Sequence, residues 1–201
     1  MEIRELSIPD SYEITPRQFA DDRGAFLEGY REGQLAEAIG HRLHVAQVNT
    51  SISKRGVVRG IHFAQIAPSQ AKYVTCNAGA VLDFVIDIRV GSPTFGQWDS
   101  VLLDDVDRRA IYIAEGLGHC FVALTDNAIV SYLVSAPFNA PREHGIHPLD
   151  PTIGLAFPDA AGAPLLSPKD EIAPTLAEAE ASGILPTWDE AKAFYAELAG
   201  N

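Results

Sequence analysis

The chain has 201 residues, of which 47% are hydrophobic and 21% are charged. This composition excludes a disordered or fibrous protein and favours one globular domain. The 27 aspartates and glutamates outnumber the 15 lysines and arginines, so the net charge is −12. A broad basic surface for a nucleic acid polymer is therefore excluded. No run of about 18 apolar residues occurs, so we expect no membrane span.

The acidic charge is concentrated in one part of the chain. Residues 1–80 carry nine basic and nine acidic side chains, whereas residues 81–201 carry six basic and 18 acidic ones. The electrically neutral part, residues 1–80, is therefore where we look for an anion site.

The start of the chain and its cysteines indicate a cellular compartment. The first residues lack a basic segment followed by an apolar core, so no secretory signal is expected. Two cysteines are too few for a disulfide framework, and both Cys76 and Cys120 lie in strand-like segments, which predicts that they are buried. We therefore expect a cytoplasmic protein.

Short segments rich in β-branched and aromatic residues predict β-strands through the middle of the chain. In chain order they are residues 43–53, 57–63, 72–76, 80–89, 99–103, 110–113, 120–124 and 128–135. Turn residues separate them, for example at 54–56 and 77–79. Many short strands without intervening helices predict an all-β protein, an antiparallel sandwich or jelly roll.

Helices are expected near the two ends. Residues 31–39 predict a short helix that ends at Gly40. Residues 187–198 predict a C-terminal helix, in which Thr187 is the N-cap and Glu190 completes a capping box. Residues 136–186 are rich in proline, alanine and glycine and predict a mostly irregular covering. Because no repeat or linker is visible, we expect one domain over residues 1–201.

Polar residues gather on neighbouring predicted strands. His62 follows Arg59 in one strand, Lys72 begins the next, and Gln47 and Asn49 lie in the preceding one. Adjacent strands would bring these side chains together at the mouth of a small barrel, which is a common place for a ligand. The alternative, and the commoner role of a strand histidine, is a structural one.

The spacing around His62 carries two further expectations. Arg59 and His62 have opposite parity, so in a regular strand they face opposite ways, and a bulge at Gly60 would turn one of them round. Metal-binding jelly rolls offer a second histidine two residues on, but position 64 is alanine and no acidic residue follows before Gly79. A metal site therefore needs ligands that this segment lacks.

Further candidate residues lie elsewhere in the chain. Arg23 could hold a phosphate through its guanidinium, although the alternative is a purely structural turn that leads into a strand. Gly116 and Gly118 would let a ligand approach the backbone before His119. Tyr132 is an acid only if its geometry allows, and is otherwise a core residue. Asp170 follows Ser167-Pro168-Lys169 in a predicted irregular segment, where an exposed carboxylate without a role is the simplest interpretation.

Short motifs along the whole chain resemble, in their order, those of one family. They are Arg23-Gly24-x-Phe26-x-Glu28, Gln47-Val48-Asn49-x-Ser51, Gly56-x-x-Arg59-Gly60-Ile61-His62-Phe63, Gln70-Ala71-Lys72, Asp87-Ile88-Arg89-x-Gly91-Ser92-Pro93-Thr94-Phe95-Gly96, Gly116-x-x-His119-x-Phe121, Glu143-His144-Gly145-Ile146, Asp150-Pro151 and Ser167-Pro168-Lys169-Asp170. The chain resembles the dTDP-4-dehydrorhamnose 3,5-epimerases over roughly residues 3–186. The resemblance implies a cupin jelly-roll barrel, a homodimer, a dTDP-4-keto-6-deoxyhexose substrate, no cofactor and no metal.

The resemblance also implies roles for individual residues. His62 resembles the general base with Asp170 as its partner, and Tyr132 resembles the acid on the opposite face of the sugar. Lys72 and Arg59 would flank the 4-keto oxygen and the diphosphate. The remaining residues expected to bind the substrate are Arg23, Phe26, Glu28, Gln47, Asn49, His119, Phe138, Glu143 and Lys169. Because Arg23, Arg59 and Lys72 all fall within residues 1–80, we expect a locally positive pocket in an acidic protein.

One position departs from the family pattern. Many members carry a second tyrosine after the acid, and here the matching residue is Phe138. The nearest competing hypothesis to a 3,5-epimerase is therefore an enzyme that inverts only one of the two carbons. A non-catalytic cupin that binds nucleotide sugars and a metal-dependent cupin oxygenase are two more distant hypotheses.

Overall fold

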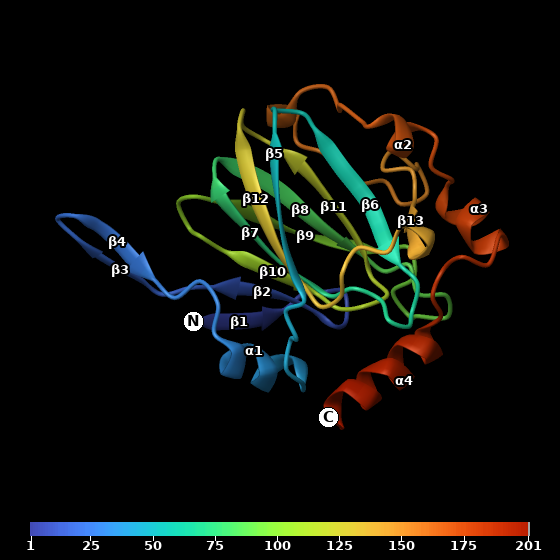
Figure 1. Cartoon of the computed structure of the whole chain (residues 1–201). Helices are drawn as coiled ribbons and strands as arrows, with labels where there is room; N and C mark the ends of the chain where they lie inside the picture. Colours follow the sequence, from blue (N-terminus) through green and yellow to red (C-terminus); the bar gives the residue numbers. More distant parts are fainter. Residues whose placement is uncertain (201) are drawn as a thin grey trace.

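Two antiparallel β-sheets face each other and form a jelly-roll barrel, as the computed structural model of residues 1–200 shows (Figure 1). One sheet has the strand order β1-β2-β10-β7-β12-β5 and the other has the order β13-β6-β11-β8-β9. A separate hairpin, β3-β4, projects from the barrel (Figure 1). The strands are β1 (Glu2–Glu5), β2 (Ser11–Thr15), β3 (Gln18–Asp21), β4 (Gly24–Leu27), β5 (Gln47–Ser53), β6 (Val58–Ala64), β7 (Lys72–Ala78), β8 (Ala80–Ile86), β9 (Trp98–Asp104), β10 (Ala110–Ile113), β11 (Gly118–Ala123), β12 (Ala128–Val134) and β13 (Glu143–Gly145). The prediction of a jelly roll is confirmed.

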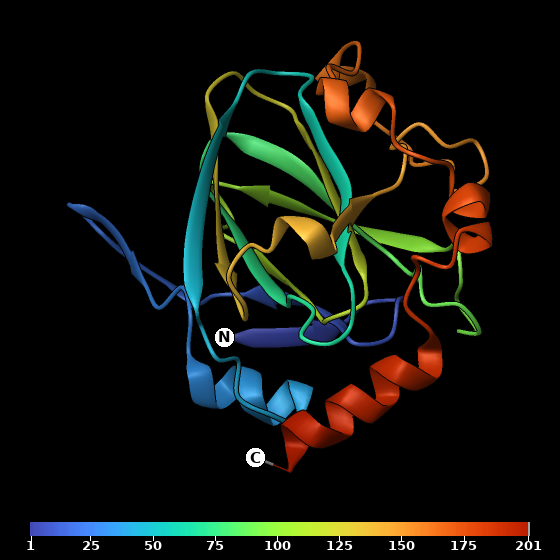
Figure 2. The same ribbon diagram turned by 45° about the vertical axis from the view of Figure 1, so that its right-hand side comes forward.

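Short helices surround the barrel. They are α1 (Glu32–Ile39), α2 (Pro168–Glu171), α3 (Leu176–Ala181), α4 (Trp188–Ala199) and the 3-10 turns Ala140–Arg142 and Asp159–Ala161. The chain after β13 runs along the outside of the five-stranded sheet and ends in α4, which lies beside α1 (Figure 2). No helix of residues 1–200 combines the length and the apolar character needed to cross a membrane.

The five-stranded sheet is buried on both of its faces. Val81 and Val85 of β8 belong to the core between the sheets, whereas Phe84 and Ile86 pack with Ile146 and more residues of the C-terminal segment. This arrangement explains why the alternating side chains of β8 are nearly all buried, the polar Asp83 included. A polar side chain on the inner face of this sheet therefore points into the barrel.

Most predicted elements are present with shifted bounds. The predicted strand at residues 43–53 begins only at Gln47, because Leu43 is buried as part of the core near α1 without joining a sheet. The predicted strand at 80–89 ends at Ile86, and after it the Asp87 carboxylate accepts hydrogen bonds from the Arg89 N–H and the Ser92 hydroxyl in a turn. The C-terminal helix and its capping box between Thr187 and Glu190 are confirmed.

Some elements were not predicted. Strands β1 to β4 precede the segments that showed clear alternation, and β13 extends the five-stranded sheet by pairing with β6. Within the region predicted to be mostly irregular, Thr175 and Glu178 form a capping box at the start of α3. The predicted burial of Cys76 and Cys120 is confirmed.

Arg89 attaches the C-terminal helix to the barrel. Its side chain is fully buried, pairs with Asp87 at 2.9 Å and with Asp10 at 2.6 Å, and stacks on Trp188 of α4 at 4.4 Å. Burial alone would raise the pKa of Asp87, but its hydrogen bonds with Arg89, Ser92 and Thr94 and the charge of Arg89 together lower it. The pair is therefore ionised and compensated inside the protein.

We expect Arg89→Met to destabilise the protein by about 3–5 kcal/mol, because the buried Asp87 carboxylate would lose its counter-charge. Urea unfolding measures this change in the free energy of unfolding. The control is Arg4→Met, which breaks a pair with Glu13 whose arginine side chain is 61% exposed, and which should cost less than about 1 kcal/mol. Equal losses in the two variants would contradict the role given to Arg89.

Candidate active site

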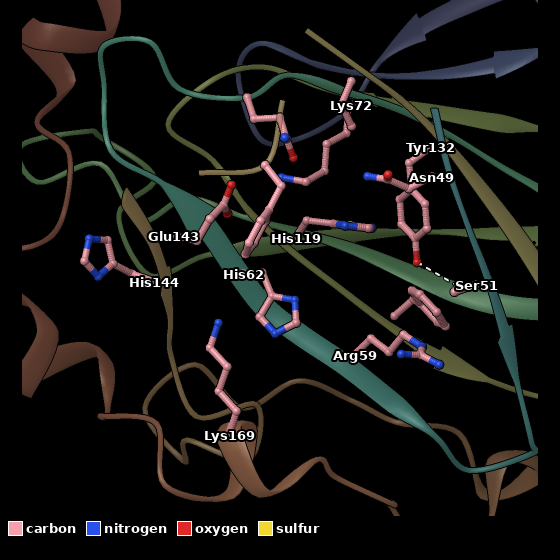
Figure 3. A pocket seen from close by; sticks show the side chains of 14 residues that line it. Asn49, Ser51, Arg59, His62, Lys72, His119, Tyr132, Glu143, His144 and Lys169 are labelled. Atoms are coloured by element: carbon pink, nitrogen blue, oxygen red, sulfur yellow. Dashed lines mark hydrogen bonds between the residues drawn. The ribbon is translucent and has the colours of Figure 1, made fainter. Parts of the chain in front are cut away.

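A cavity of about 280 Å³ lies between the two sheets and collects most of the predicted site residues (Figure 3). Its walls come from β5, β7 and β12 of one sheet, from β6, β11 and β13 of the other, and from the loop and helix that follow. The lining residues are Asn49, Ser51, Arg59, His62, Gln70, Lys72, His119, Phe121, Tyr132, Val134, Phe138, Glu143, His144 and Lys169.

A bulge in β6 turns Arg59 and His62 into the same cavity. His62 is paired with His119 and Arg59 with Phe121, so β6 has one more residue than β11 over this stretch. Gly60 lies within the bulge with a φ of +125°, and a Cβ there would collide with the carbonyl oxygen of His119. Only glycine fits both this conformation and this contact. The predicted bulge at Gly60 is confirmed.

His62 and Asp170 form a hydrogen-bonded dyad. Nε2 of His62 lies 2.8 Å from Oδ1 of Asp170, and Ser167 Oγ donates to Oδ2 of the same carboxylate at 2.8 Å. Burial would raise the pKa of Asp170, but the hydrogen bonds from His62 and Ser167, the charge of His62 and that of Lys169 lower it overall. The carboxylate is therefore available to hold a proton on Nε2, which leaves Nδ1 as the basic nitrogen of the imidazole.

Tyr132 reaches the cavity from the opposite sheet. Its hydroxyl lies 3.0 Å from Ser51 Oγ of the neighbouring strand β5. Its ring packs edge-on against His119, with ring centroids 5.9 Å apart, and tilted against Phe121, with centroids 6.4 Å apart. Burial raises the pKa of Tyr132, against a smaller opposing effect of the Ser51 hydrogen bond, so the hydroxyl keeps its proton at neutral and mildly basic pH.

A second histidine is fixed by a buried carboxylate. Nε2 of His119 lies 2.9 Å from both oxygens of Asp83, which is fully buried. Burial raises the pKa of Asp83, although the charges of His119 and Lys72 and the hydrogen bond of His119 oppose this effect. The imidazole of His119 is thereby held in one orientation at the cavity wall.

Lys72 places an amine in the inner part of the cavity. It is only 8% exposed, and among residues 1–200 no hydrogen bond or ion pair holds its Nζ. Burial lowers its pKa, and the negative charges of Glu143, Glu115 and Asp83 oppose this effect. When it is protonated, a desolvated amine of this kind interacts strongly with negative charge on a bound molecule.

The charged lining of the cavity is mainly basic. Arg59, Lys72 and Lys169 face a single acidic lining residue, Glu143. Two of these cations come from residues 1–80, as expected, but Lys169 comes from the acidic part of the chain, and Arg23 is not among the lining residues. The cavity thus suits an anionic ligand in a protein of net charge −12.

Not every predicted site residue lies at the cavity. Arg23, Phe26 and Glu28 lie on or beside the projecting hairpin, where the Arg23 side chain is 90% exposed and Phe26 is 68% exposed. Asp170 lies behind His62 and is hydrogen-bonded to its Nε2. Gln47 borders the site, since its amide donates to Asn49 at 2.5 Å and accepts from the backbone of Phe138 at 3.4 Å.

Several lining residues were not predicted. Ser51 shares a strand face with Asn49, so a period of two could have identified it. Gln70 precedes Lys72 by two residues in the same short motif. Phe121 and Val134 lie two residues after His119 and Tyr132, and His144 follows Glu143. Each of them lies one or two positions along the chain from a site residue that was predicted.

Comparisons with known proteins identify the family of the chain. A family model described as dTDP-4-dehydrorhamnose 3,5-epimerase matches residues 5–178. The chain belongs to this family. The dTDP-4-dehydrorhamnose 3,5-epimerase of Mycolicibacterium smegmatis is 55% identical over 201 residues, which are 100% of this chain and 98% of that protein. The rmlC epimerase of Mycobacterium tuberculosis has the same fold, with a TM-score of 0.96 and 53% identity, over 98% of this chain and 100% of that one.

The family also contains enzymes with a narrower description. The dTDP-4-dehydrorhamnose 3-epimerase of Streptomyces niveus is 54% identical over 188 residues, which are 94% of this chain and 90% of that protein. Identity to the 3-epimerase and to the 3,5-epimerases is therefore nearly equal.

Proposed function

We propose that the chain epimerises dTDP-4-dehydro-6-deoxy-D-glucose at C3 and C5, which gives dTDP-4-dehydro-L-rhamnose. The observation that carries this proposal is the placement of His62, backed by Asp170, and of the Tyr132 hydroxyl on opposite walls of one basic cavity. Figure 3 shows the side chains of His62 and Tyr132 in this cavity. Inversion of a carbon next to a ketone needs a base on one face of the sugar and an acid on the other, and the two sheets supply one each.

The first step is removal of a proton from C3 or C5 by Nδ1 of His62. The electron pair of the broken C–H bond moves toward the 4-keto oxygen and gives an enolate. Asp170 stabilises the imidazolium that forms. Lys72, with its buried amine, stabilises the enolate oxygen, and one donor of this kind is typically worth about 3–4 kcal/mol.

The second step is protonation on the other face. The O–H bond of Tyr132 breaks, its proton forms a new C–H bond with the enolate carbon, and the 4-keto group is restored. The configuration of that carbon is then inverted. Arg59 and Lys169 in the cavity lining are placed to bind the diphosphate, and His119 to hold the sugar.

We expect Asp170→Asn to lower kcat by about 10³-fold with little change in KM. The neutral amide of asparagine no longer stabilises the imidazolium by its charge. If the amide nitrogen donates to Nε2, the imidazole carries its proton on Nδ1, and that nitrogen is no longer basic. Steady-state kinetics measures the effect. The comparison variant Ser167→Ala removes the hydrogen bond to Oδ2 and the N-cap contact of the same hydroxyl with the Asp170 N–H, but it keeps the carboxylate, so its loss should be much smaller. Full activity in Asp170→Asn would contradict the role of the dyad.

Incubation of the keto sugar with the enzyme in heavy water tests the proposed reaction. Deuterium at both C3 and C5, followed by NMR, is the expected result. Exchange at one carbon only, even after long incubation, would support the single-carbon hypothesis, for which the phenyl ring of Phe138 at the cavity rim is the structural reason. Tight binding of dTDP without any exchange would indicate a non-catalytic nucleotide-sugar binder.

We further propose that the active form is a homodimer in which each projecting hairpin completes the cavity of the partner subunit. Arg23 and Phe26 have the chemistry to bind a phosphate and a base, but in their own subunit both are exposed to solvent. Exposed Phe19 packs against Phe26 at 6.5 Å, so the hairpin presents an aromatic surface without a core of its own. A symmetric pair of subunits would use both hairpins in the same way.

Mixing two inactive variants tests this arrangement. We expect Arg23→Ala and His62→Ala to be weak or inactive alone, and a refolded mixture to recover part of the activity. In a mixed dimer one cavity would combine an intact His62 with an intact hairpin from the other subunit. A mixture without activity above the sum of its components, or a monomer by light scattering, would contradict the proposal.

A further inference from the structure

The side-chain hydroxyl of Ser51 lies against the hydroxyl of Tyr132. Ser51 lies on β5 and is paired in register with Val130, so its side chain is diagonal to Tyr132 on the face that lines the cavity. The two hydroxyl oxygens are 3.0 Å apart (Figure 3). Among residues 1–200 no other group forms a hydrogen bond with Ser51 Oγ. The proposed reaction has two proton transfers, and neither of them uses Ser51.

We propose that Ser51 is a positioning residue for Tyr132, which directs the phenol proton toward the enolate carbon and stabilises the phenolate that remains. This inference rests on the proposed function, because it takes Tyr132 to be the acid of the epimerisation. Ser51 does not itself touch the reacting carbon in this scheme. Its effect is exerted through the hydroxyl of Tyr132.

The direction of the hydrogen bond follows from the proton that Tyr132 must release. A phenol that donates its proton to carbon can only accept a hydrogen bond from a neighbour, so the Ser51 hydroxyl must be the donor when the reaction occurs. When the phenol O–H bond breaks, the electron pair stays on the phenol oxygen. The Ser51 proton then faces a phenolate, and a hydrogen bond to a charged group is stronger than one to a neutral group.

A purely structural role does not account for this contact, because different residues hold the ring. His119 packs edge-on against the ring of Tyr132 and Phe121 packs beside it, while the backbone of β12 is held between β5 and β7. Removal of the Ser51 hydroxyl should therefore leave the ring in place and release only the phenol oxygen. The loss is expected in the protonation step, and neither in folding nor in substrate binding.

The electrostatic surroundings of Tyr132 make its hydrogen bond with Ser51 important for the release of the phenol proton. Burial raises the pKa of Tyr132 and opposes its action as an acid, and the charge of Asp83 acts in the same direction. The Ser51 hydrogen bond and the charge of Arg59 are the opposing effects. Ser51 is thus the only hydrogen-bond donor that residues 1–200 offer to the forming phenolate.

The ratio of two rates separates the two halves of the reaction. In heavy water, His62 can remove a proton from carbon and return a deuteron to the same face, which gives exchange without inversion. Inversion needs Tyr132. The ratio of inversion to exchange, measured by NMR at each carbon, therefore reports protonation by Tyr132, whereas a general loss of active enzyme lowers both rates together.

We expect Ser51→Ala to lower the ratio of inversion to exchange by about tenfold, with KM changed by less than about twofold. Ser51→Thr keeps the hydroxyl and should restore most of the ratio. The matched control is Ser182→Ala, which also removes one serine hydrogen bond, to the carbonyl of Ala179 at 2.9 Å, at the end of helix α3. This control should have the ratio of the wild type.

Three results with Ser51→Ala would overturn the inference. Parallel losses of exchange and inversion, an unchanged ratio, or a rise in KM alone would show that Ser51 acts in folding or binding instead. An equal loss in Ser51→Thr would show that the hydroxyl is not the cause. Failure of the proposed function has a different signature, since the wild-type enzyme itself would then show no exchange at C3 or C5.

Discussion

Replacement of His62 by alanine should lower deuterium exchange at C3 and at C5 by about 10⁴-fold, because one base serves both carbons. The imidazole combines a basic nitrogen facing the ligand with a carboxylate partner behind it, through the 2.8 Å contact with Asp170. NMR in heavy water measures both positions in the same sample. Loss at one carbon alone would mean that a second base serves the other.

The controls for this variant test whether the protein still folds and binds, and whether His62 and Asp170 act as one unit. His62→Ala should still bind dTDP, because the cationic residues at the cavity are unchanged. His44→Ala removes an exposed histidine away from the cavity and should be fully active. The double variant His62→Ala with Asp170→Asn should be no slower than His62→Ala, because two residues that act as one unit are not additive. Near-normal exchange in His62→Ala would remove the residue from the role of base.

The parts of the fold that could be predicted are those with a local signal. Strands such as β10 show alternation or a continuous apolar run, and the helix after Thr187 has its capping box within four residues. The hairpin β3-β4 lacks such a signal, because its strands of four residues are almost entirely exposed in this subunit. Helix α2 has only four residues, so its periodicity is too short to be recognised.

The site depends on contacts that no local pattern contains. The residues of the His62–Asp170 pair are 108 positions apart, and those of the Ser51–Tyr132 pair are 81 apart. The first pair could be predicted through the family resemblance, which supplies long-range information that this one sequence lacks. The second depends on the register of β5 against β12, and a shift by one residue would turn Ser51 to the other face. That register is a property of the packed sheet.

Replacement of Tyr132 by phenylalanine should separate exchange from inversion more completely than any other single change at the site. We expect inversion to fall by about 10³-fold or more, while exchange continues on the face of His62 and KM stays nearly the same. The ring of phenylalanine can keep the packing against His119 and Phe121, so only the proton is lost.

The matched control for Tyr132→Phe is Tyr12→Phe, which removes a hydroxyl on β2, outside the cavity, and should be indistinguishable from the wild type. Inversion at the full rate in Tyr132→Phe would mean that another group, such as a bound water, is the acid. The variant also decides how Ser51 acts. If Ser51 works only through the phenol, then adding Ser51→Ala to Tyr132→Phe should cause no further loss of inversion. A further loss would place Ser51 in direct contact with the substrate, and the part of the site that controls stereochemistry would then include β5 as well as β12.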